Sequence, residues 1–202
     1  MRLSGATTPG AVFPEQTAPT LPPPRRAVLL DRDGVLNEDR GYTHRPEDFS
    51  FMPGAAEAVA WLNRAGWLVI VVTNQSGIGR GYYSEAEFVG FTRWIEARLG
   101  EHGAWLDATF FCPHHPTEAE GSYRVACGCR KPAPGMLRAA LAHFALDAKD
   151  CFMVGDKTSD LEAAAYCGMR SLRFAGGNLE RFLKSAIQGE DRGTGKALDL
   201  LR

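Results

Sequence analysis

Short apolar runs alternate along the chain with segments whose apolar residues recur every three or four positions. The apolar runs predict buried strands over residues 27–31, 67–73, 106–111, 151–154 and 170–174. The intervening segments predict helices that begin near Pro53, Ser84, Pro134 and Thr158. This alternation predicts an α/β fold, a Rossmann-like parallel sheet with helices on both faces.

One of these helices has a specific start signal. Ser84 is followed three residues later by Glu87, which is the spacing of a capping box. The apolar face of the same helix then consists of Phe88, Phe91, Ile95 and Leu99.

The two ends of the chain depart from the alternating pattern. Residues 1–25 hold 6 of the 12 prolines and show no hydrophobic period, so we expect a disordered, proline-rich tail. Residues 26–174 form the expected domain. Residues 175–202 form a C-terminal extension that is partly helical, with a weak helical pattern over residues 179–187. No large insert separates the predicted elements, so we expect no large cap domain and an open site.

The amino-acid composition narrows the class of protein further. A chain of 202 residues with 45 % hydrophobic residues fits one globular domain, and its net charge of −1 argues against binding to nucleic acid. The longest uniformly apolar stretch, residues 67–72, is far shorter than the ~18 residues of a membrane span. The 5 cysteines form an odd set and no signal peptide precedes them, so we expect a cytoplasmic protein. We also expect a monomer.

Two aspartates follow the first predicted strand. Asp31 ends that strand and Asp33 stands two residues later, so a turning loop can direct both into one cavity. One carboxylate can attack phosphorus and form a covalent phosphoryl intermediate. The other can protonate the leaving oxygen and later deprotonate water. An Asp-x-Asp pair alone is more often part of a turn or a helix cap, so this hypothesis depends on the other polar motifs in the chain.

Other polar residues stand at the ends of other predicted elements, and parallel strands bring their carboxyl ends to one edge. Thr73 and Asn74 end a strand and can bind a phosphoryl oxygen. The glycine-containing stretch 75–79 is flexible enough for its backbone to approach a ligand. Lys131 precedes a proline, so it lies in an extended loop, where it can neutralise phosphoryl charge and orient Asp31.

A second acidic pair follows the strand over residues 151–154. Asp156, together with Asp31, would give Mg²⁺ the two carboxylates that it usually takes. Asp160 either holds Lys157 or supports the site from behind, or it is an ordinary acid in the first turn of a helix.

The chain resembles the haloacid dehalogenase superfamily of phosphatases over residues 26–174. The resemblance rests on four motifs in this order: Asp31-Arg32-Asp33-Gly34, Thr73, Lys131 and the stretch 155–160. The resemblance implies that Asp31 is the nucleophile and Asp33 the general acid and base. It implies that Thr73 and Lys131 stabilise the phosphoryl group. It also implies that Mg²⁺ is held by Asp31, the backbone oxygen of Asp33, and Asp156.

Four possible metal ligands lie in the loop before Lys131. Cys112-x-His114 is followed by twelve residues and then by Cys127-x-Cys129. Such a set suits tetrahedral Zn²⁺ and leaves no open position, so we predict one zinc-bound loop with a structural role. His115 is a competing ligand, and a reduced cysteine cluster or a disulfide is an alternative.

The zinc-loop motif, Cys-Pro-His-His-Pro followed by Cys-Gly-Cys-Arg-Lys-Pro, narrows the resemblance. It is similar to the heptose 1,7-bisphosphate 7-phosphatases and to their relatives, the histidinol-phosphate phosphatases. The resemblance implies a Mg²⁺-dependent phosphatase that removes the 7-phosphate of a small sugar phosphate. The implied substrate contacts are Asp39, Arg40, Gly41, Tyr42, Thr73, Asn74, Gln75, Ser76, Arg130, Lys131 and Lys157. Val35 stands where many relatives carry threonine, a departure that the loop position tolerates.

Two alternatives stay open at this point. One is a histidinol-phosphate phosphatase, which would differ in accepting an amino-imidazole group instead of a second phosphate. The other is a zinc-stabilised binding module that has kept the fold without turnover. A phosphatase acting on nucleic acid is disfavoured because the near-zero net charge offers no surface that tracks a phosphate backbone.

Overall fold

The computed structural model of the chain describes residues 8–14 and 25–191. A six-stranded sheet has the order β1-β4-β3-β2-β5-β6. Neighbouring strands run parallel, except that β1 is antiparallel to β4. The strands are β1 (Gly10–Val12), β2 (Arg26–Leu30), β3 (Trp67–Asn74), β4 (Ala108–Cys112), β5 (Cys151–Gly155) and β6 (Arg170–Arg173).

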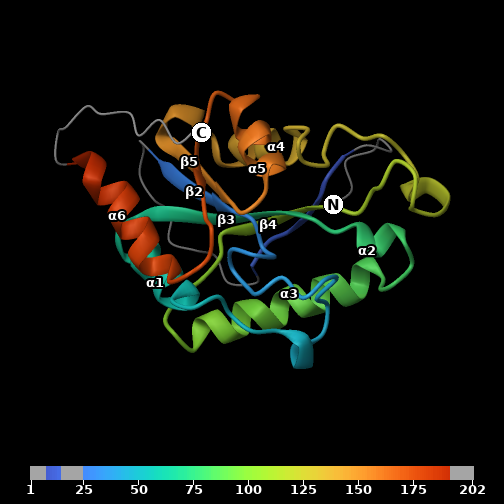
Figure 1. The fold of residues 1–202 in the computed structure, drawn as a ribbon, viewed down its shortest axis with the longest axis horizontal. Coiled ribbons are helices and arrows are strands. Elements are labelled where there is room, and N and C mark those ends of the chain that lie inside the picture. The colour runs from blue at the N-terminus through green and yellow to red at the C-terminus, as the bar shows by residue number, and fades with distance from the viewer. Residues whose placement is uncertain (1–7, 15–24, 192–202) are drawn as a thin grey trace.

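Helices cover both faces of this sheet, as the alternating pattern predicts. Figure 1 shows α1, α3 and α6 on one side and α4 and α5 on the other. The helices are α1 (Ala55–Arg64), α2 (Ser76–Gly79), α3 (Glu85–Gly100), α4 (Gly135–Phe144), α5 (Thr158–Ala165) and α6 (Leu179–Asp191). Short 3₁₀ turns span Pro46–Asp48, Gly121–Tyr123 and Ala148–Asp150.

The core has two large apolar layers, one on each face of the sheet, and a smaller third cluster that includes Phe88 and Phe111. Along β3, Val69 and Val71 pack into the layer with α1, α3 and α6, whereas Leu68, Ile70 and Val72 pack into the layer with α4 and α5. Successive strand residues point to opposite faces, so a strand buried on both sides must be apolar throughout. This is why β3 is one continuous hydrophobic run.

The N-terminal segment differs from the expectation of an unstructured tail. Gly10–Val12 form β1, with Val12 paired to Thr109 and Gly10 paired to Phe111 of β4. A Cβ atom on Gly10 would meet the Phe111 ring at 2.2 Å, so this pairing requires glycine. Three residues are too few to show a hydrophobic period, which explains why the pattern misses this strand. Residues 1–7 and 15–24 of the expected tail lie outside the described residues.

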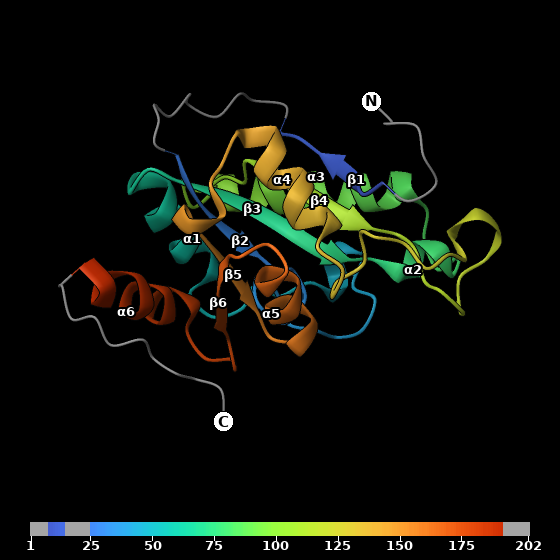
Figure 2. The same ribbon diagram turned by 90° about the horizontal axis from the view of Figure 1, so that it is seen from above.

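The C-terminal helix belongs to the packed layer. Leu179 and Leu183 of α6 are completely buried against the layer that contains α1. The weak helical pattern therefore corresponds to a helix that helps to close one face of the sheet, at the end of the molecule far from α2 (Figure 2). Across residues 8–14 and 25–191, no helix has the length and apolar character that crossing a bilayer requires.

The predicted capping box is confirmed. The backbone N–H of Glu87 donates to Ser84 Oγ at 3.1 Å, and the backbone N–H of Ser84 donates to Glu87 Oε2 at 2.7 Å. These bonds satisfy two backbone donors at the start of α3, the longest described helix. The cap also fixes where the chain between β3 and α3 must end.

Candidate active site

The ends of three adjacent parallel strands bring the candidate chemistry together. Leu30 at the end of β2 pairs with Val71 of β3 on one side and with Val154 of β5 on the other. The backbone N–H of Asp31 then donates to Val154 O at 2.9 Å, which fixes the first residue beyond β2. Asp31, Thr73 and Asp156 therefore meet at one edge of the sheet.

A buried lysine lies at the centre of this edge. Lys131 Nζ is 2.9 Å from Asp31 Oδ1 and 2.6 Å from Asp160 Oδ1. It also donates to Val72 O at 2.7 Å, so its three protons have three oxygen partners. Burial lowers the pKa of Lys131, but attraction to Asp31 and Asp160 outweighs burial and raises it, so the side chain stays charged.

The proposed nucleophile has an unusual environment for a carboxylate. Burial raises the pKa of Asp31 to about 6, although Lys131 opposes the shift. Asp31 Oδ1 also accepts the backbone N–H of Arg32 at 2.8 Å. At neutral pH the group is ionised but poorly hydrated, which suits a nucleophile.

The position of Lys131 is fixed from β3. Asn74 Nδ2 donates to Lys131 O at 3.1 Å, and the backbone N–H of Lys131 donates to Asn74 Oδ1 at 3.0 Å. This pair of bonds uses both ends of the Asn74 amide. A residue expected to touch substrate therefore holds the lysine loop against the end of β3.

Asp33 is surrounded by hydrogen-bond donors. Arg32 donates from Nε to Asp33 Oδ2 at 3.1 Å and from Nη2 to Asp33 Oδ1 at 3.0 Å. Asn37 Nδ2 and Gln75 Nε2 donate to the same carboxylate at 3.1 and 3.0 Å. Arg32 is itself fully buried and also donates to Thr43 O at 2.6 Å. Sequence reasoning missed Arg32, although a cation between two acids in the motif is a visible signal.

Three carboxylates at the strand ends could hold a metal ion. One oxygen from each of Asp31, Asp156 and Asp160 lies within 4.8 Å of the others. Asp156 Oδ1 is buried and has no hydrogen-bond partner among the described residues, so it is free to ligate. A Cβ atom on Gly34 would meet Asp156 Oδ2 at 2.4 Å, so only glycine allows this approach. An all-oxygen donor set suits Mg²⁺.

Compared with the predicted magnesium set, the cluster contains Asp160 in place of Asp33. The side chain of Asp33 is engaged by Arg32 and Gln75 instead, and only its backbone oxygen was expected to ligate. Asp160 Oδ2 accepts the backbone N–H of Lys157 at 3.0 Å, while Oδ1 faces Lys131. Asp160 therefore holds the Lys131 ammonium and also caps the first turn of α5 through the backbone of Lys157, so the supporting role and the first-turn role that the sequence left open both describe it.

The expected substrate contacts around residues 39–42 are only partly brought to the site. Lys157 Nζ donates to Asp39 Oδ2 at 2.9 Å. Burial raises the pKa of Asp39, but hydrogen bonds from Lys157 and from the Gly41 N–H outweigh burial and lower it. Arg40 Nη2 is instead drawn 2.7 Å from Glu38 in an exposed ion pair, and it also bonds Ser50.

Aromatic rings stand beside this segment. Tyr42 is 44 % exposed, and its ring meets that of Tyr82 edge-on with centroids 4.9 Å apart. The Arg80 guanidinium lies 5.6 Å from the centroid of the Tyr42 ring. Tyr42 can therefore present a partly exposed face to a bound ligand.

The glycine-containing stretch after β3 differs from the flexible loop that the sequence predicts. It forms the single turn α2 (Ser76–Gly79), and all of its residues are buried. A Cβ atom on Gly79 would meet Pro113 O at 2.5 Å, so this glycine allows α2 to pack under the cysteine-containing loop. Ser76 is buried within this turn and Gln75 just before it.

The four predicted zinc ligands form one cluster. Cys129 Sγ lies 3.3 Å from both Cys112 Sγ and Cys127 Sγ, and His114 Nδ1 lies 3.3 Å from Cys129 Sγ. Four ligands around tetrahedral zinc would lie about 3.5 to 4 Å apart, so the donors fit with a slight expansion. The sulfurs are too far apart for a disulfide, which requires about 2.05 Å, and all three cysteines are free.

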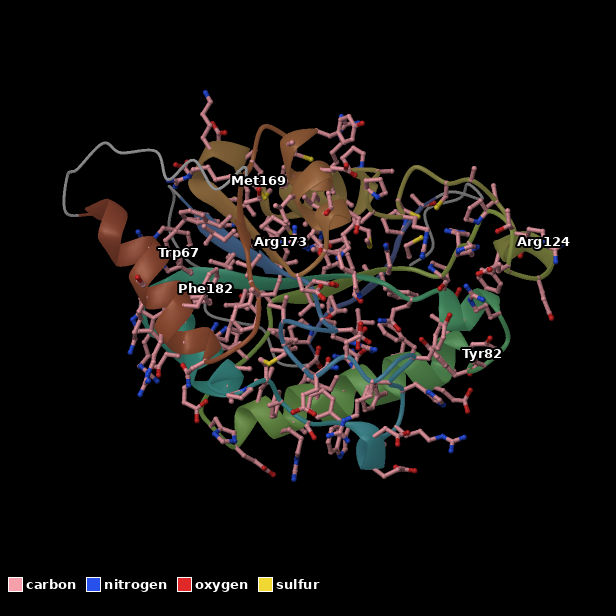
Figure 3. All side chains as sticks on the ribbon, viewed as in Figure 1. Trp67, Tyr82, Arg124, Met169, Arg173 and Phe182 are labelled. Atoms are coloured by element: carbon pink, nitrogen blue, oxygen red, sulfur yellow. The ribbon has the colours of Figure 1, made fainter. Side chains whose placement is uncertain are left out.

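The competing ligand His115 lies outside the cluster. Its Nδ1 accepts the backbone N–H of Glu118 at 3.1 Å, and its Nε2 is 3.6 Å from Glu118 Oε2. Glu118 also pairs with Arg80, which follows α2. Figure 3 labels Tyr82 after α2 and Arg124 in the cysteine-containing loop at the same end of the molecule.

This loop leads directly to the edge of the sheet at which Asp31 and Asp156 lie. Cys129 is followed by Arg130 and then by Lys131, so one residue separates a cluster sulfur from the buried lysine. Arg130 Nη1 donates to His114 O at 3.3 Å. Ordering the cluster therefore also orders the backbone that presents Lys131.

Comparison with known proteins is consistent with this geometry. Residues 128–191 match a protein-family model described as HAD-hydrolase-like. A D-glycero-β-D-manno-heptose-1,7-bisphosphate 7-phosphatase of Pasteurella multocida is 48 % identical over 139 residues, covering 69 % of this chain and 75 % of that protein. The Escherichia coli K12 protein of the same name is 44 % identical over 138 residues, covering 68 % and 72 %.

Two solved structures are also similar. A HAD-like phosphatase of Mesorhizobium loti superposes with a TM-score of 0.77 at 31 % identity, over 91 % of this chain and 94 % of that one. A D,D-heptose 1,7-bisphosphate phosphatase from B. bronchiseptica, complexed with magnesium and phosphate, gives a TM-score of 0.68 at 35 % identity, over 79 % of this chain and 86 % of that one.

The parallel sheet and the aspartates and lysine at its edge define a class of enzyme, the phosphoric monoester hydrolases with a HAD-like fold. The chain belongs to the HAD-like hydrolase family, and within it this phosphatase is similar to the heptose 1,7-bisphosphate 7-phosphatases. The alternative of a binding module without turnover is therefore set aside.

Proposed function

We propose that this phosphatase removes the 7-phosphate of D-glycero-D-manno-heptose 1,7-bisphosphate, with Mg²⁺, through a phosphoaspartyl intermediate on Asp31. The observation that carries the mechanism is the contact of Lys131 Nζ with Asp31 at 2.9 Å inside a buried site. The names of the similar proteins support the substrate.

The first half of the reaction transfers the phosphoryl group. A carboxylate oxygen of Asp31 attacks phosphorus, and the bond from phosphorus to the sugar oxygen breaks. Asp33 gives its proton to that oxygen, so the sugar leaves as an alcohol. Lys131 balances negative charge as the two anions approach, and Thr73 would donate its hydroxyl to a phosphoryl oxygen.

The second half restores the enzyme. Asp33, now ionised, takes a proton from water, and the water oxygen attacks phosphorus. The bond between phosphorus and Asp31 breaks, and inorganic phosphate leaves. Asp33 returns to its protonated state, so the proton that it donates in the first half is replaced by the proton that it takes from water in the second.

Mg²⁺ would be held by Asp31, Asp156 and the backbone oxygen of Asp33. Bound there, it would neutralise phosphoryl charge. The unpartnered Asp156 Oδ1 and the clustered carboxylates support this assignment.

Zn²⁺ would be held by the cluster Cys112, His114, Cys127 and Cys129 and would be structural, because four protein ligands leave no place for water. The thiols must stay reduced to bind metal. This requirement fits a reducing compartment such as the cytoplasm.

Several groups beside the catalytic edge can contact the sugar. Lys157 and Asp39 form an ion pair in which both side chains are partly exposed, and Tyr42 offers a partly exposed ring. Arg130 follows the zinc cluster directly and offers a guanidinium to the second phosphate. A ligand with two phosphates and several hydroxyls matches this mixture of charges.

A phosphate-release assay tests the proposal. The purified enzyme is given Mg²⁺ with heptose 1,7-bisphosphate, fructose 1,6-bisphosphate or histidinol phosphate, and kcat/KM is measured for each. We expect the heptose to be preferred, and ³¹P NMR of the product should show that only the 1-phosphate remains. Preference for histidinol phosphate would overturn the substrate assignment and leave the phosphoaspartyl chemistry standing. Turnover by Asp31→Asn would overturn the chemistry.

A further inference from the structure

The surroundings of Gln75 differ from those expected of a substrate-binding residue. It directly follows β3, where a polar side chain is expected to face the substrate, yet it is only 2 % exposed. Its Nε2 donates to Asp33 Oδ2 at 3.0 Å and to Thr73 Oγ1 at 2.9 Å. Its Oε1 accepts the hydroxyl of Tyr83 at 2.7 Å. Both ends of the amide are therefore occupied by protein groups.

The chemistry of these partners allows only one orientation of the amide. The Asp33 carboxyl already accepts hydrogen bonds from Arg32 and Asn37, so it presents acceptor oxygens to Gln75 and must face the amide nitrogen. The amide oxygen then faces Tyr83, whose hydroxyl must donate. Burial raises the pKa of Tyr83 to about 12, so that hydroxyl keeps its proton. Reversing the amide would set oxygen against carboxylate.

Tyr83 is itself held in place by packing. It is 4 % exposed, and its ring stacks on His44 with centroids 4.5 Å apart and planes 14° apart. A rigid ring thus fixes the amide, and the amide spans the proposed acid and the proposed phosphoryl-binding hydroxyl.

We propose that Gln75 is a positioning residue that fixes the Asp33 carboxyl relative to the phosphoryl group, and that Tyr83 fixes the orientation of the Gln75 amide. Gln75 then acts on the proton transfer and does not contact the sugar. This inference rests on the proposed function in one respect, the assignment of Asp33 as acid and base.

The leaving group provides a readout specific to this role. An alkyl oxygen needs a proton in order to leave, whereas p-nitrophenolate is a weak base that leaves without one. The value of kcat/KM covers the steps up to loss of the leaving group, so it excludes the later attack of water. Misplacing Asp33 should therefore lower kcat/KM for the alkyl phosphate more than for p-nitrophenyl phosphate.

The experiment compares Gln75→Leu, Tyr83→Phe and the wild-type enzyme on the sugar bisphosphate and on p-nitrophenyl phosphate. We expect the ratio of the two kcat/KM values to fall about tenfold in Gln75→Leu and by a smaller factor in Tyr83→Phe. Tyr123→Phe is the matched control, because it removes a hydroxyl that donates to Glu85 at 2.8 Å, away from Asp33. Its ratio should equal that of the wild type.

A second cycle separates positioning from general damage. In an Asp33→Asn background, Gln75→Leu should leave the ratio unchanged, because the group that it positions is already disabled. An equal loss on both substrates, or the same fall with Asp33 already replaced, overturns the inference. If Gln75→Leu fails to fold, Tyr83→Phe decides by the same ratio.

The proposed substrate can fail separately from this inference. If the wild type hydrolyses another alkyl phosphate better than the heptose bisphosphate, the substrate assignment is wrong, and that ester takes its place in the ratio. A normal leaving-group ratio in Asp33→Asn would instead refute the acid–base assignment, and the inference with it.

Discussion

A buried aspartate far along the chain from the catalytic motifs should control how stability depends on pH. Asp107 precedes β4, is 5 % exposed, and accepts the backbone N–H of Val69 at 2.7 Å through Oδ2. Burial raises its pKa from 3.8 to about 6, against the effect of that hydrogen bond. The perturbation is Asp107→Asn, which keeps an oxygen acceptor for Val69 and removes the charge.

The magnitude follows from the shift in pKa. The folded state holds the proton of Asp107 more tightly than the unfolded state, so the contribution of this group to stability is full below about pH 4 and is lost as pH rises through about 6. A shift of about 2 units corresponds to about 3 kcal/mol lost by pH 8. Asp107→Asn has no such loss, so it should be more stable than the wild type by up to that amount at pH 8. The matching gain in Tm is roughly 6 to 12 °C.

Urea unfolding at pH 4.5 and pH 8, with thermal melts beside it, measures this difference. Asp107→Asn should be the more stable protein by about 1 kcal/mol at pH 4.5 and by about 3 kcal/mol at pH 8, because the wild type loses most of the contribution of Asp107 between these two values. Since Asp107 lies at the opposite end of β4 from Cys112, kcat should be unchanged. A gain that is the same at both pH values, or a loss at pH 8, would refute the reasoning.

Four substitutions test the site itself. Asp33→Asn should slow turnover by about 10² to 10⁴ in steady-state kinetics. Lys131→Met leaves its buried aspartates uncompensated, so urea titration should find a loss of about 3 to 5 kcal/mol in the free energy of unfolding. Cys127→Ser should lose the predicted zinc, about one ion per chain in the wild type by elemental analysis. Gly34→Ala should raise the Mg²⁺ concentration needed for half-maximal activity, because its Cβ atom would meet Asp156 Oδ2 at 2.4 Å.

Each of these results has an opposite that would count against the corresponding role. Asp33→Asn could retain the wild-type rate, and Lys131→Met could retain the wild-type stability. Cys127→Ser could keep a full complement of zinc. Gly34→Ala could respond to Mg²⁺ as the wild type does, which would place the metal away from Asp156.

The sequence was sufficient to predict the sheet and the edge at which the chemistry gathers. Strands buried on both faces are apolar throughout, so runs such as Trp67–Asn74 are visible without any partner. Parallel strands must end at the same edge, so the pattern predicts that Asp31 and Asp156 meet although they are 125 positions apart in the chain. These conclusions depend on local pattern and on general topology.

The direction of individual polar side chains could not be predicted in this way. Asn74 and Gln75 stand where substrate contacts are expected, but their partners are Lys131, 57 positions away, and Tyr83, 8 positions away. Only the folded arrangement decides whether an amide meets ligand or protein. The order of the strands and the three-residue strand β1 were likewise hidden, because both depend on pairing and leave no periodic signal.

β1, in the N-terminal segment, covers the exposed edge of the sheet at β4. A parallel sheet that ended at β4 would leave the backbone groups along Thr109–Phe111 free to bind the edge of another chain, and β1 occupies them with an antiparallel partner. A protein shortened to begin at residue 26 would keep every residue to which we assign a catalytic role but would lose this cover. We expect such a protein to self-associate as its concentration rises, which light scattering would detect. These few residues therefore contribute to the colloidal stability of the protein.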